Sequence, residues 1–276
     1  MVVEKLYESG DYIIVYKPYD MYINSDDTYE KNTVACHIAS HDSHHSNSSN
    51  PLYFVQRLDY STSGILCIAK HKAAAAKAGK LFEERLSRKY YLAIVRGHIF
   101  FDLADVRYAI GLNTSVGNKH KMSALSYQTT CERPRAAHTR LLVLETGYYN
   151  EDPITIVLLK PVTGGLHFQC RRHQLRVHCA SIGHTILGDY TYSNALDIYP
   201  HRMYLHANRL ILPFEDNPLD IQTPEPFFSD PQFINKWIPE KLKHDYRNLA
   251  EFRMACDVID ASYIHGIKYE EFSYLP

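Results

Sequence analysis

Residues 56–64 read QRLDYSTSG and place one arginine and one aspartate in a polar, turn-forming stretch. The next residues, GILCIAK at 64–70, are apolar and β-branched, as in a buried strand. Arg57 and Asp59 are therefore predicted at the edge of a strand. Taken alone, such a pair is more typical of a turn or a surface ion pair than of a catalytic site.

Working outward from this stretch, short apolar segments alternate with single helical patterns. The strand-like segments are rich in β-branched and aromatic residues, and the helical ones contain strong helix formers or precede a glycine. Short strands interrupted by single helices lack the regular alternation of a doubly wound fold. We therefore predict an α+β fold with a mixed or antiparallel sheet. The predicted strands are residues 11–17, 64–70, 91–96 and 154–160, and the predicted helices are residues 72–87 and 173–182.

Two segments depart from this pattern. Residues 40–50, SHDSHHSNSSN, are polar and of low complexity, and they predict a flexible surface insertion. The three histidines of the insertion have no rigid frame or second ligand cluster, so a metal site is not predicted there. From Pro213 onward, five prolines precede an aromatic, charged stretch that we expect to be helical through about Tyr269. We therefore predict a catalytic domain over residues 1–214 and an acidic extension over residues 215–276.

Charge is unevenly distributed along the chain. The formal net charge is −1, but residues 213–276 hold 6 Lys and Arg against 12 Asp and Glu, a net −6. Residues 1–212 are left with 24 basic and 19 acidic side chains, a net +5. A mildly basic body permits RNA binding, although many enzymes without a polyanionic partner share it. We expect the acidic extension to pack on the body, with guarding of the cleft or recruitment of a protein as alternatives.

The cysteines and the apolar segments bear on whether the protein is disulfide-linked, zinc-binding or membrane-spanning. Six scattered cysteines without a CxxC pair predict neither a zinc site nor a disulfide framework. No stretch reaches the roughly 18 apolar residues of a membrane span, and the acidic N-terminal residues are unlike a signal peptide. We expect a monomeric cytoplasmic protein without a membrane partner, and leave mitochondrial and nuclear locations open.

Four further segments of the chain indicate what kind of site residues 56–64 belong to. This stretch resembles the HRLDxxTSG motif of the RluA family of pseudouridine synthases, and the other segments resemble further motifs of that family in the expected order. Together they extend over roughly residues 11–214. Family members without a preceding RNA-binding domain are the most similar. The segments are IVYKP at residues 14–18, KYYLAIVRG at 89–97, RRHQLRVHCASIGHTILGDYTY at 171–192 and LHANRL at 205–210.

The resemblance implies the pseudouridine synthase catalytic fold, with a mostly antiparallel sheet, flanking helices and a central cleft. It also implies isomerisation of uridine to pseudouridine in structured RNA, such as tRNA or rRNA. Asp59 matches the catalytic aspartate, whose carboxylate could attack C1′ of the sugar, attack C6 of the base or abstract a sugar proton. Arg176 matches the arginine that would pair with Asp59 and lower its pKa. An isomerisation without redox change needs no metal and no organic cofactor.

Tyr91 matches the tyrosine of the KxYLA motif. The resemblance implies that it stacks on the target base and that its hydroxyl assists removal of the C5 proton. Tyr90 is the competing assignment, but side chains alternate along a strand, and the spacing from Lys89 selects Tyr91. Leu205 matches the leucine before the HA pair and would supply an apolar wall.

The remaining matched positions concern RNA contacts and the loop around the aspartate. Arg57 and Arg171 would contact the sugar-phosphate backbone. Arg57 could also fill the gap left by an extruded uridine, with a buried structural salt bridge as the alternative. Gln56 replaces the usual histidine, and as a neutral hydrogen-bonding residue it could preserve the loop.

Two other classes of protein compete with this interpretation. A catalytically silent RNA-binding protein could keep the fold, but it would not need Asp59, Tyr91 and Arg176 together. A hydrolase using Ser61 or Ser63 would need a base and an oxyanion turn, and the sequence has no nucleophile-elbow pattern.

Overall fold

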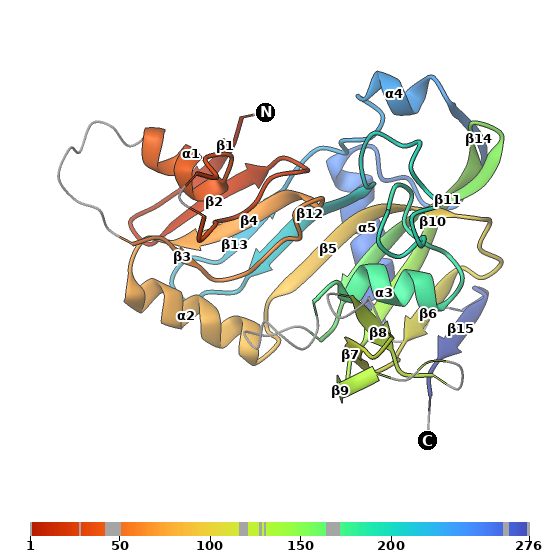
Figure 1. The fold of residues 1–276 in the computed structure, drawn as a ribbon, viewed down its shortest axis with the longest axis horizontal. Helices are drawn as coiled ribbons and strands as arrows, with labels where there is room; N and C mark the ends of the chain where they lie inside the picture. The colour runs from red at the N-terminus through yellow and green to blue at the C-terminus, as the bar shows by residue number, and fades with distance from the viewer. Residues whose placement is uncertain are drawn as a thin grey trace.

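The computed structural model describes residues 2–27, 29–41, 51–115, 121–126, 129, 131–163, 172–261 and 265–274. The fold is built around one large twisted sheet with helices against both faces (Figure 1). The predicted α+β class is confirmed. Among the described helices, none combines the length and the apolar character needed to cross a bilayer.

The large sheet contains twelve strands in the part of the chain that is described. Its pairs are antiparallel except β4 with β12 and β6 with β15, so the sheet is mixed but mostly antiparallel. Three strands pair off the main path: β3 (Tyr53–Phe54) with β4, β13 (Leu219–Gln222) with β12, and β14 (Trp237–Leu242) with β10. In spatial order the main path is β1 (Glu4–Glu8), β2 (Tyr12–Lys17), β4 (Ser63–Ala69), β12 (Leu205–Leu212), β5 (Arg88–Arg96), β11 (Asp152–Pro161), β10 (Thr139–Tyr149), β6 (Leu103–Val106) and β15 (Tyr269–Phe272).

Alternation along the central strands creates two separate cores. Leu92 and Ile94 of β5 pack on one face with α5 (Leu249–Asp260), whereas Ala93 and Val95 pack on the other face with α3 (Gln174–Ser181). Figure 1 shows α3 in front of the sheet and α5 behind it. Successive residues of β5 therefore serve opposite faces. The other helices are α1 (Val34–His41), α2 (Lys72–Glu83) and α4 (Pro231–Ile234).

Helix α2 forms where strong helix formers follow a capping residue. His71 Nδ1 accepts the Ala74 backbone N–H at 3.2 Å at its start. The helix ends four residues before the predicted end, since Arg85 adopts a left-handed conformation with φ of 60°. Helix α3 lies within one residue of its prediction at each end.

A separate three-stranded sheet lies against α3. It consists of β8 (Met122–Ala124), β7 (Ile110–Asn113) and β9 (Cys131–Arg135), with β7 in the centre. Val177 of α3 packs into its core with Ile110 and Met122. This packing connects the small sheet to the helix that carries Arg176.

The C-terminal segment differs from the prediction of a largely helical stretch through about Tyr269. It contains α4 and α5, but also β14 and β15, which pair with β10 and β6. Pro239 disfavours a helix within β14, and the open edges of β10 and β6 have backbone groups that need partners.

The acidic segment packs on the body of the protein. Phe227, Phe233, Trp237 and Phe252 join the core behind the sheet. The predicted boundary at residue 214 stays a prediction, and most of the predicted insertion at residues 40–50 lies outside the described residues.

Oppositely charged side chains cross from this segment to the body. Asp260 lies 2.6 Å from Lys160 and 3.4 Å from Arg88, and Asp220 accepts two hydrogen bonds from Arg209. These ion pairs between the acidic segment and the basic body help to hold the two together.

Candidate active site

Asp59 lies in the turn between β3 and β4, and Lys17 holds this turn in place. Lys17, the last residue of β2, is completely buried. Its ammonium donates hydrogen bonds to the carbonyls of Pro18 and Met21 at 2.8 Å and of Tyr60 at 2.9 Å. Burial lowers the pKa of Lys17 to about 7, but three carbonyl acceptors favour its charged form. Lys17 thus fastens the Asp59 turn to the chain that follows β2.

Gly64 allows β12 to approach the same turn. It adopts φ of 112°, and a Cβ atom there would lie 2.3 Å from the Ala207 carbonyl oxygen. Only glycine fits both the conformation and the close approach. The glycine of the TSG stretch is therefore a packing requirement of the parallel pair formed by β4 and β12.

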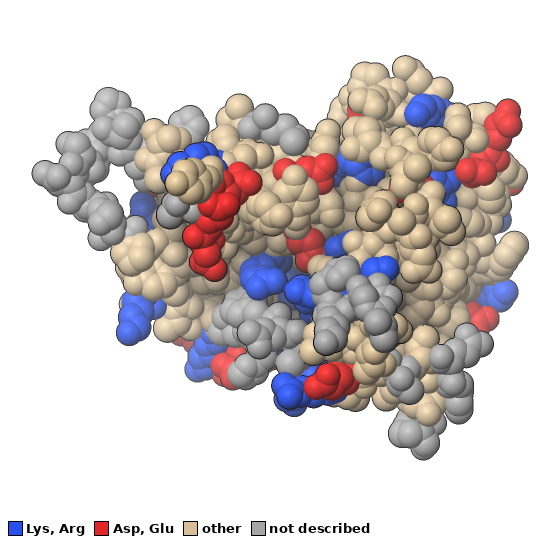
Figure 2. Space-filling view, viewed as in Figure 1, with Lys and Arg blue, Asp and Glu red and all other residues tan. Residues whose placement is uncertain are grey.

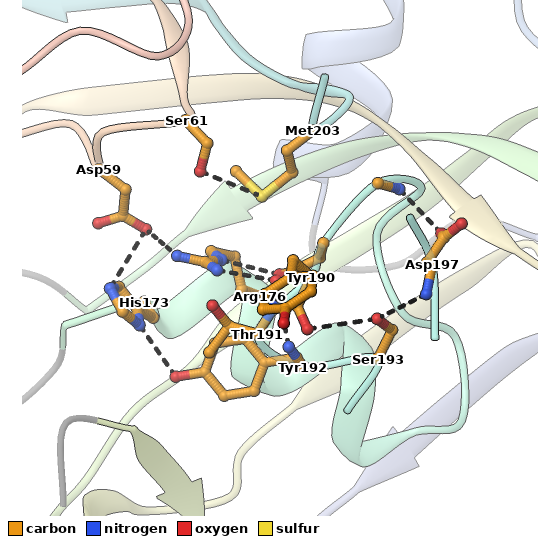
Figure 3. Close-up of polar contacts among 12 residues, drawn as sticks. Asp59, Ser61, His173, Arg176, Tyr190, Thr191, Tyr192, Ser193, Asp197 and Met203 are labelled. Atoms are coloured by element: carbon orange, nitrogen blue, oxygen red, sulfur yellow. Dashed lines mark hydrogen bonds and ion pairs between the residues drawn. The ribbon is translucent and has the colours of Figure 1, made fainter. Parts of the chain in front are cut away.

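Arg176 joins two carboxylates. Its Nε and Nη2 each donate to Asp189 at 2.7 Å, and its Nη1 donates to Asp59 Oδ2 at 3.2 Å (Figure 3). The Arg176 side chain is 6% exposed, the Asp189 side chain 0% and the Asp59 side chain 22%. Burial disfavours the charge of Arg176, but the hydrogen bonds and charge of Asp189 and the charge of Asp59 outweigh burial and raise its pKa. Arg176 is thus a fixed cation beside a partly exposed carboxylate.

Tyr91 and Tyr90 point to opposite faces of β5. Tyr91 lines the cleft with Asp59, whereas Tyr90 is buried on the other face and donates a 2.7 Å hydrogen bond to Asp260. Burial and then the charge of Asp59 raise the pKa of Tyr91, so its hydroxyl keeps its proton at neutral pH. Leu205 of β12 packs in the same cluster as Tyr91 and also lines the cleft.

The cleft has basic side chains around it. Arg57, Lys89 and Arg172 line it together with Arg176. Figure 2 shows Lys and Arg atoms gathered around the hollow in the middle of this face. Arg57 is exposed, which does not fit the alternative of a buried salt bridge. Arg171 lies outside the described residues.

Five of the six predicted site residues thus line one cleft. Gln56 lines it as well and supports its wall. The side-chain amide of Gln56 donates to the Ile65 carbonyl at 3.1 Å, so a neutral residue does preserve the loop. The five are Arg57, Asp59, Tyr91, Arg176 and Leu205.

The sequence interpretation assigned no role to four residues that hold the site. Lys17 and Asp189 fix the aspartate turn and the arginine, and His173 and Tyr192 approach Asp59 from the start of α3 and the loop after it (Figure 3). A signal for Asp189 was available, because a buried arginine needs a carboxylate and GDYTY supplies one.

The cleft can bind and polarise an organic substrate with its own side chains. In the described part of the chain, no three His, Cys, Asp or Glu side chains are grouped as metal ligands. A carboxylate, a phenol and an apolar wall meet at one end, and basic side chains surround them. This arrangement suits a flat ring joined to a polyanionic backbone.

Comparison with known proteins gives a consistent result. A family model described as RNA pseudouridylate synthase matches residues 11–181. The chain is 42% identical over 236 residues to RNA pseudouridylate synthase domain-containing protein 1 of Danio rerio, covering 85% of this chain and 78% of that protein. It is 36% identical over 178 residues to the dual-specificity RNA pseudouridine synthase RluA of Escherichia coli strain K12, covering 63% and 73%.

A solved structure agrees with these sequence matches. The structure titled human RNA Pseudouridylate Synthase Domain Containing 1 superposes with a TM-score of 0.76 at 36% identity. The match covers 94% of this chain and 95% of that one.

Proposed function

Since the chain belongs to the RNA pseudouridylate synthase family and is an isomerase, an RNA pseudouridine synthase, we propose that it converts uridine to pseudouridine in structured RNA with Asp59 as the catalytic carboxylate. The main support is the ion pair of Asp59 with Arg176 at 3.2 Å inside the cleft lined by Tyr91 and Leu205. The guanidinium holds the carboxylate in place in the cleft, and the reaction uses that carboxylate.

The carboxylate has three chemical paths. It can attack C1′ and displace the base, attack C6 of the base, or abstract a sugar proton as the glycosidic bond breaks. Each path detaches uracil from C1′, lets it rotate and rejoins it through C5. Each path also ends with loss of the C5 proton, the step that release of tritium from 5-tritiated uridine measures.

Tyr91 is proposed to stack on the uracil ring. Because burial raises the pKa of Tyr91, its phenol keeps its proton in the free protein. Its hydroxyl oxygen therefore relays the C5 proton: it accepts that proton from C5 while it donates its own proton to solvent water, so no preformed phenolate is needed. Leu205 closes the apolar side of the pocket.

The basic rim is proposed to hold the RNA backbone. Arg57, Lys89 and Arg172 surround the cleft, and Arg171 is proposed to add a further phosphate contact. A uridine stacked in a helix must leave its stack to reach Asp59, at a cost of a few kcal/mol. We propose that exposed Arg57 occupies the space the base leaves. tRNA and rRNA are the structured substrates proposed.

We also propose that the enzyme acts as a cytoplasmic monomer. The buried thiols of Cys67, Cys179 and Cys256 are free, as is usual for proteins of a reducing compartment.

The proposal is tested by pseudouridine mapping. RNA from cells lacking the protein is incubated with the purified wild type or with Asp59→Ala, and pseudouridine is located by carbodiimide mapping and nucleoside mass spectrometry. Sites that appear with the wild type and not with Asp59→Ala support the proposal and name the RNA. Asp216→Ala is the control, because Asp216 is a surface residue whose side chain is 86% exposed.

The alternative of a silent RNA-binding protein gives a different result. Wild type that binds the RNA but adds no pseudouridine to any site would contradict the proposal. The combination of Asp59, Tyr91 and Arg176 in one cleft disfavours this outcome, since a carboxylate in the cleft repels phosphate and a protein that only binds RNA does not need it.

A further inference from the structure

His173 occupies a strained position next to Asp59. It precedes α3 with φ of 62°, in the left-handed region that favours glycine or asparagine, and its side chain makes no capping hydrogen bond. Its imidazole instead points toward Asp59, with Nε2 3.9 Å from Oδ2 (Figure 3). The backbone cost at this residue is therefore not offset by capping of the helix.

The hydrogen bonds around Tyr192 fix the position of the imidazole proton. The Met122 backbone N–H can only donate, and it donates to the Tyr192 hydroxyl oxygen at 3.1 Å. The Tyr192 hydroxyl proton is then free for His173 Nδ1, 3.0 Å away. If Nδ1 carried the proton, the phenol oxygen would accept two hydrogen bonds and its own hydrogen would lose this partner. Nδ1 is therefore the acceptor, and a neutral imidazole carries its proton on Nε2, facing Asp59.

Both side chains of this pair stay neutral over the ordinary pH range. Burial lowers the pKa of His173 to about 4 and raises the pKa of Tyr192 to about 12. The Arg176 guanidinium lies 5.1 Å from the centre of the Tyr192 ring and packs over it.

The contacts on Asp59 are unequal between its two oxygens. Arg176 Nη1 and His173 Nε2 both face Oδ2, at 3.2 and 3.9 Å. In Figure 3 the other oxygen, Oδ1, has no dashed contact with the residues drawn. A carboxylate held through one oxygen presents the other to a substrate.

We propose that Tyr192 is a positioning residue that holds His173 as the Nε2–H tautomer, and that His173 and Arg176 together anchor Oδ2 of Asp59 so that Oδ1 reacts. This inference rests on the proposed function and extends it to two further side chains. The 3.9 Å distance from His173 Nε2 to Asp59 Oδ2 is longer than a hydrogen bond. A movement of the imidazole by about 1 Å, as RNA fills the cleft, brings the two atoms within hydrogen-bond distance. The small sheet takes part through the Met122 N–H.

The tautomer is tested directly by long-range ¹H–¹⁵N NMR of the histidine rings. The His173 signals are assigned by their loss in His173→Asn. We expect the wild type to show the Nε2–H form of His173 from pH 6 to 8, and Tyr192→Phe to shift it toward the Nδ1–H form. A wild-type Nδ1–H form, or an unchanged tautomer in Tyr192→Phe, would overturn the proposal.

Rates on RNA test the consequence for Asp59. Tyr192→Phe is expected to slow single-turnover pseudouridine formation roughly tenfold at unchanged RNA affinity, as expected for loss of one orienting hydrogen bond. His173→Gly relieves the backbone strain, so it should melt no lower than the wild type and still be slow. Tyr190→Phe is the matched control, because Tyr190 is in the same loop and 63% exposed.

The outcomes separate this inference from the proposed function. His173→Gly or Tyr192→Phe reacting at the wild-type rate would overturn the role in positioning Asp59. Wild type that forms no pseudouridine would contradict the proposed function, while the NMR result would still decide the tautomer.

Discussion

Replacement of Arg176 by lysine tests how the cleft holds its carboxylate. The guanidinium uses three nitrogens, two for Asp189 at 2.7 Å and one for Asp59 at 3.2 Å. A lysine ammonium keeps the charge but cannot reproduce this planar fork. Arg176→Lys therefore loses about two of three charge-assisted hydrogen bonds and leaves the buried Asp189 side chain poorly paired.

The size of the effect follows from these bonds. Each hydrogen bond to a charged group contributes about 1.5–3 kcal/mol, and the retained ammonium recovers part of the loss. We expect the free energy of unfolding to fall by about 3 kcal/mol, and the melting temperature by about 5 °C for a chain of this length. The single-turnover rate should fall by about 10²-fold, as when one donor to a reacting group is removed.

Urea unfolding and single-turnover release of tritium from 5-tritiated uridine in RNA measure the two effects. Arg209→Lys is the matched control, because Arg209 makes the same two-bond fork with Asp220, whose side chain is 39% exposed. It should lose under about 1 kcal/mol and keep its rate. Arg176→Lys with wild-type stability and rate would refute the reasoning.

Three further predictions follow from the same structure. Tyr91→Phe should bind RNA normally but release tritium about 10²-fold more slowly, whereas Tyr90→Phe should lose stability and not rate; equal rates of the two variants in the tritium assay would contradict this. Gly64→Ala should lower the free energy of unfolding by at least about 3 kcal/mol in urea, because its Cβ would meet a backbone oxygen at 2.3 Å, and a near-neutral change would mean that the strands shift freely. Burial lowers the pKa of His178 to about 4 and of His206 to about 3, so the unfolded state binds their protons first as the pH falls below about 6.5. The free energy of unfolding should therefore be highest above that pH and decrease toward pH 4, by up to about 1.4 kcal/mol per pH unit for each histidine. Urea unfolding at pH 7 and pH 5 measures this decrease, which should be smaller in His206→Asn than in the wild type. An equal decrease in the two proteins would exclude His206 as a contributor.

The local elements of the fold could be predicted from the sequence. The strand at residues 64–70 corresponds to β4 and the alanine-rich helix to α2, because apolar runs and helix formers act over a few neighbouring residues. Strands β14 and β15 could not be predicted in this way. They form because β10 and β6 offer open edges, and these edges exist only after the chain has folded.

The active-site residues likewise divide into those that local sequence rules predict and those whose role depends on the folded chain. The alternation of β5 places Tyr90 and Tyr91 on opposite faces, and the KxYLA spacing from Lys89 selects Tyr91 for the cleft. The role of Lys17 depends on a contact across the fold, with the Tyr60 carbonyl 43 residues away, and neither spacing nor composition reveals it. The RluA-like motifs predict which residues line the cleft, and the structure shows which contacts hold their side chains.

The most direct test of the account replaces Asp59 by asparagine, which keeps the shape of the side chain and removes its charge. Single-turnover tritium release from 5-tritiated uridine in the mapped RNA would be measured with RNA affinity and melting temperature determined in parallel. The account predicts a fall in rate of at least roughly 10³-fold with RNA binding retained. Release at the wild-type rate would contradict the assignment of Asp59 as the catalytic carboxylate.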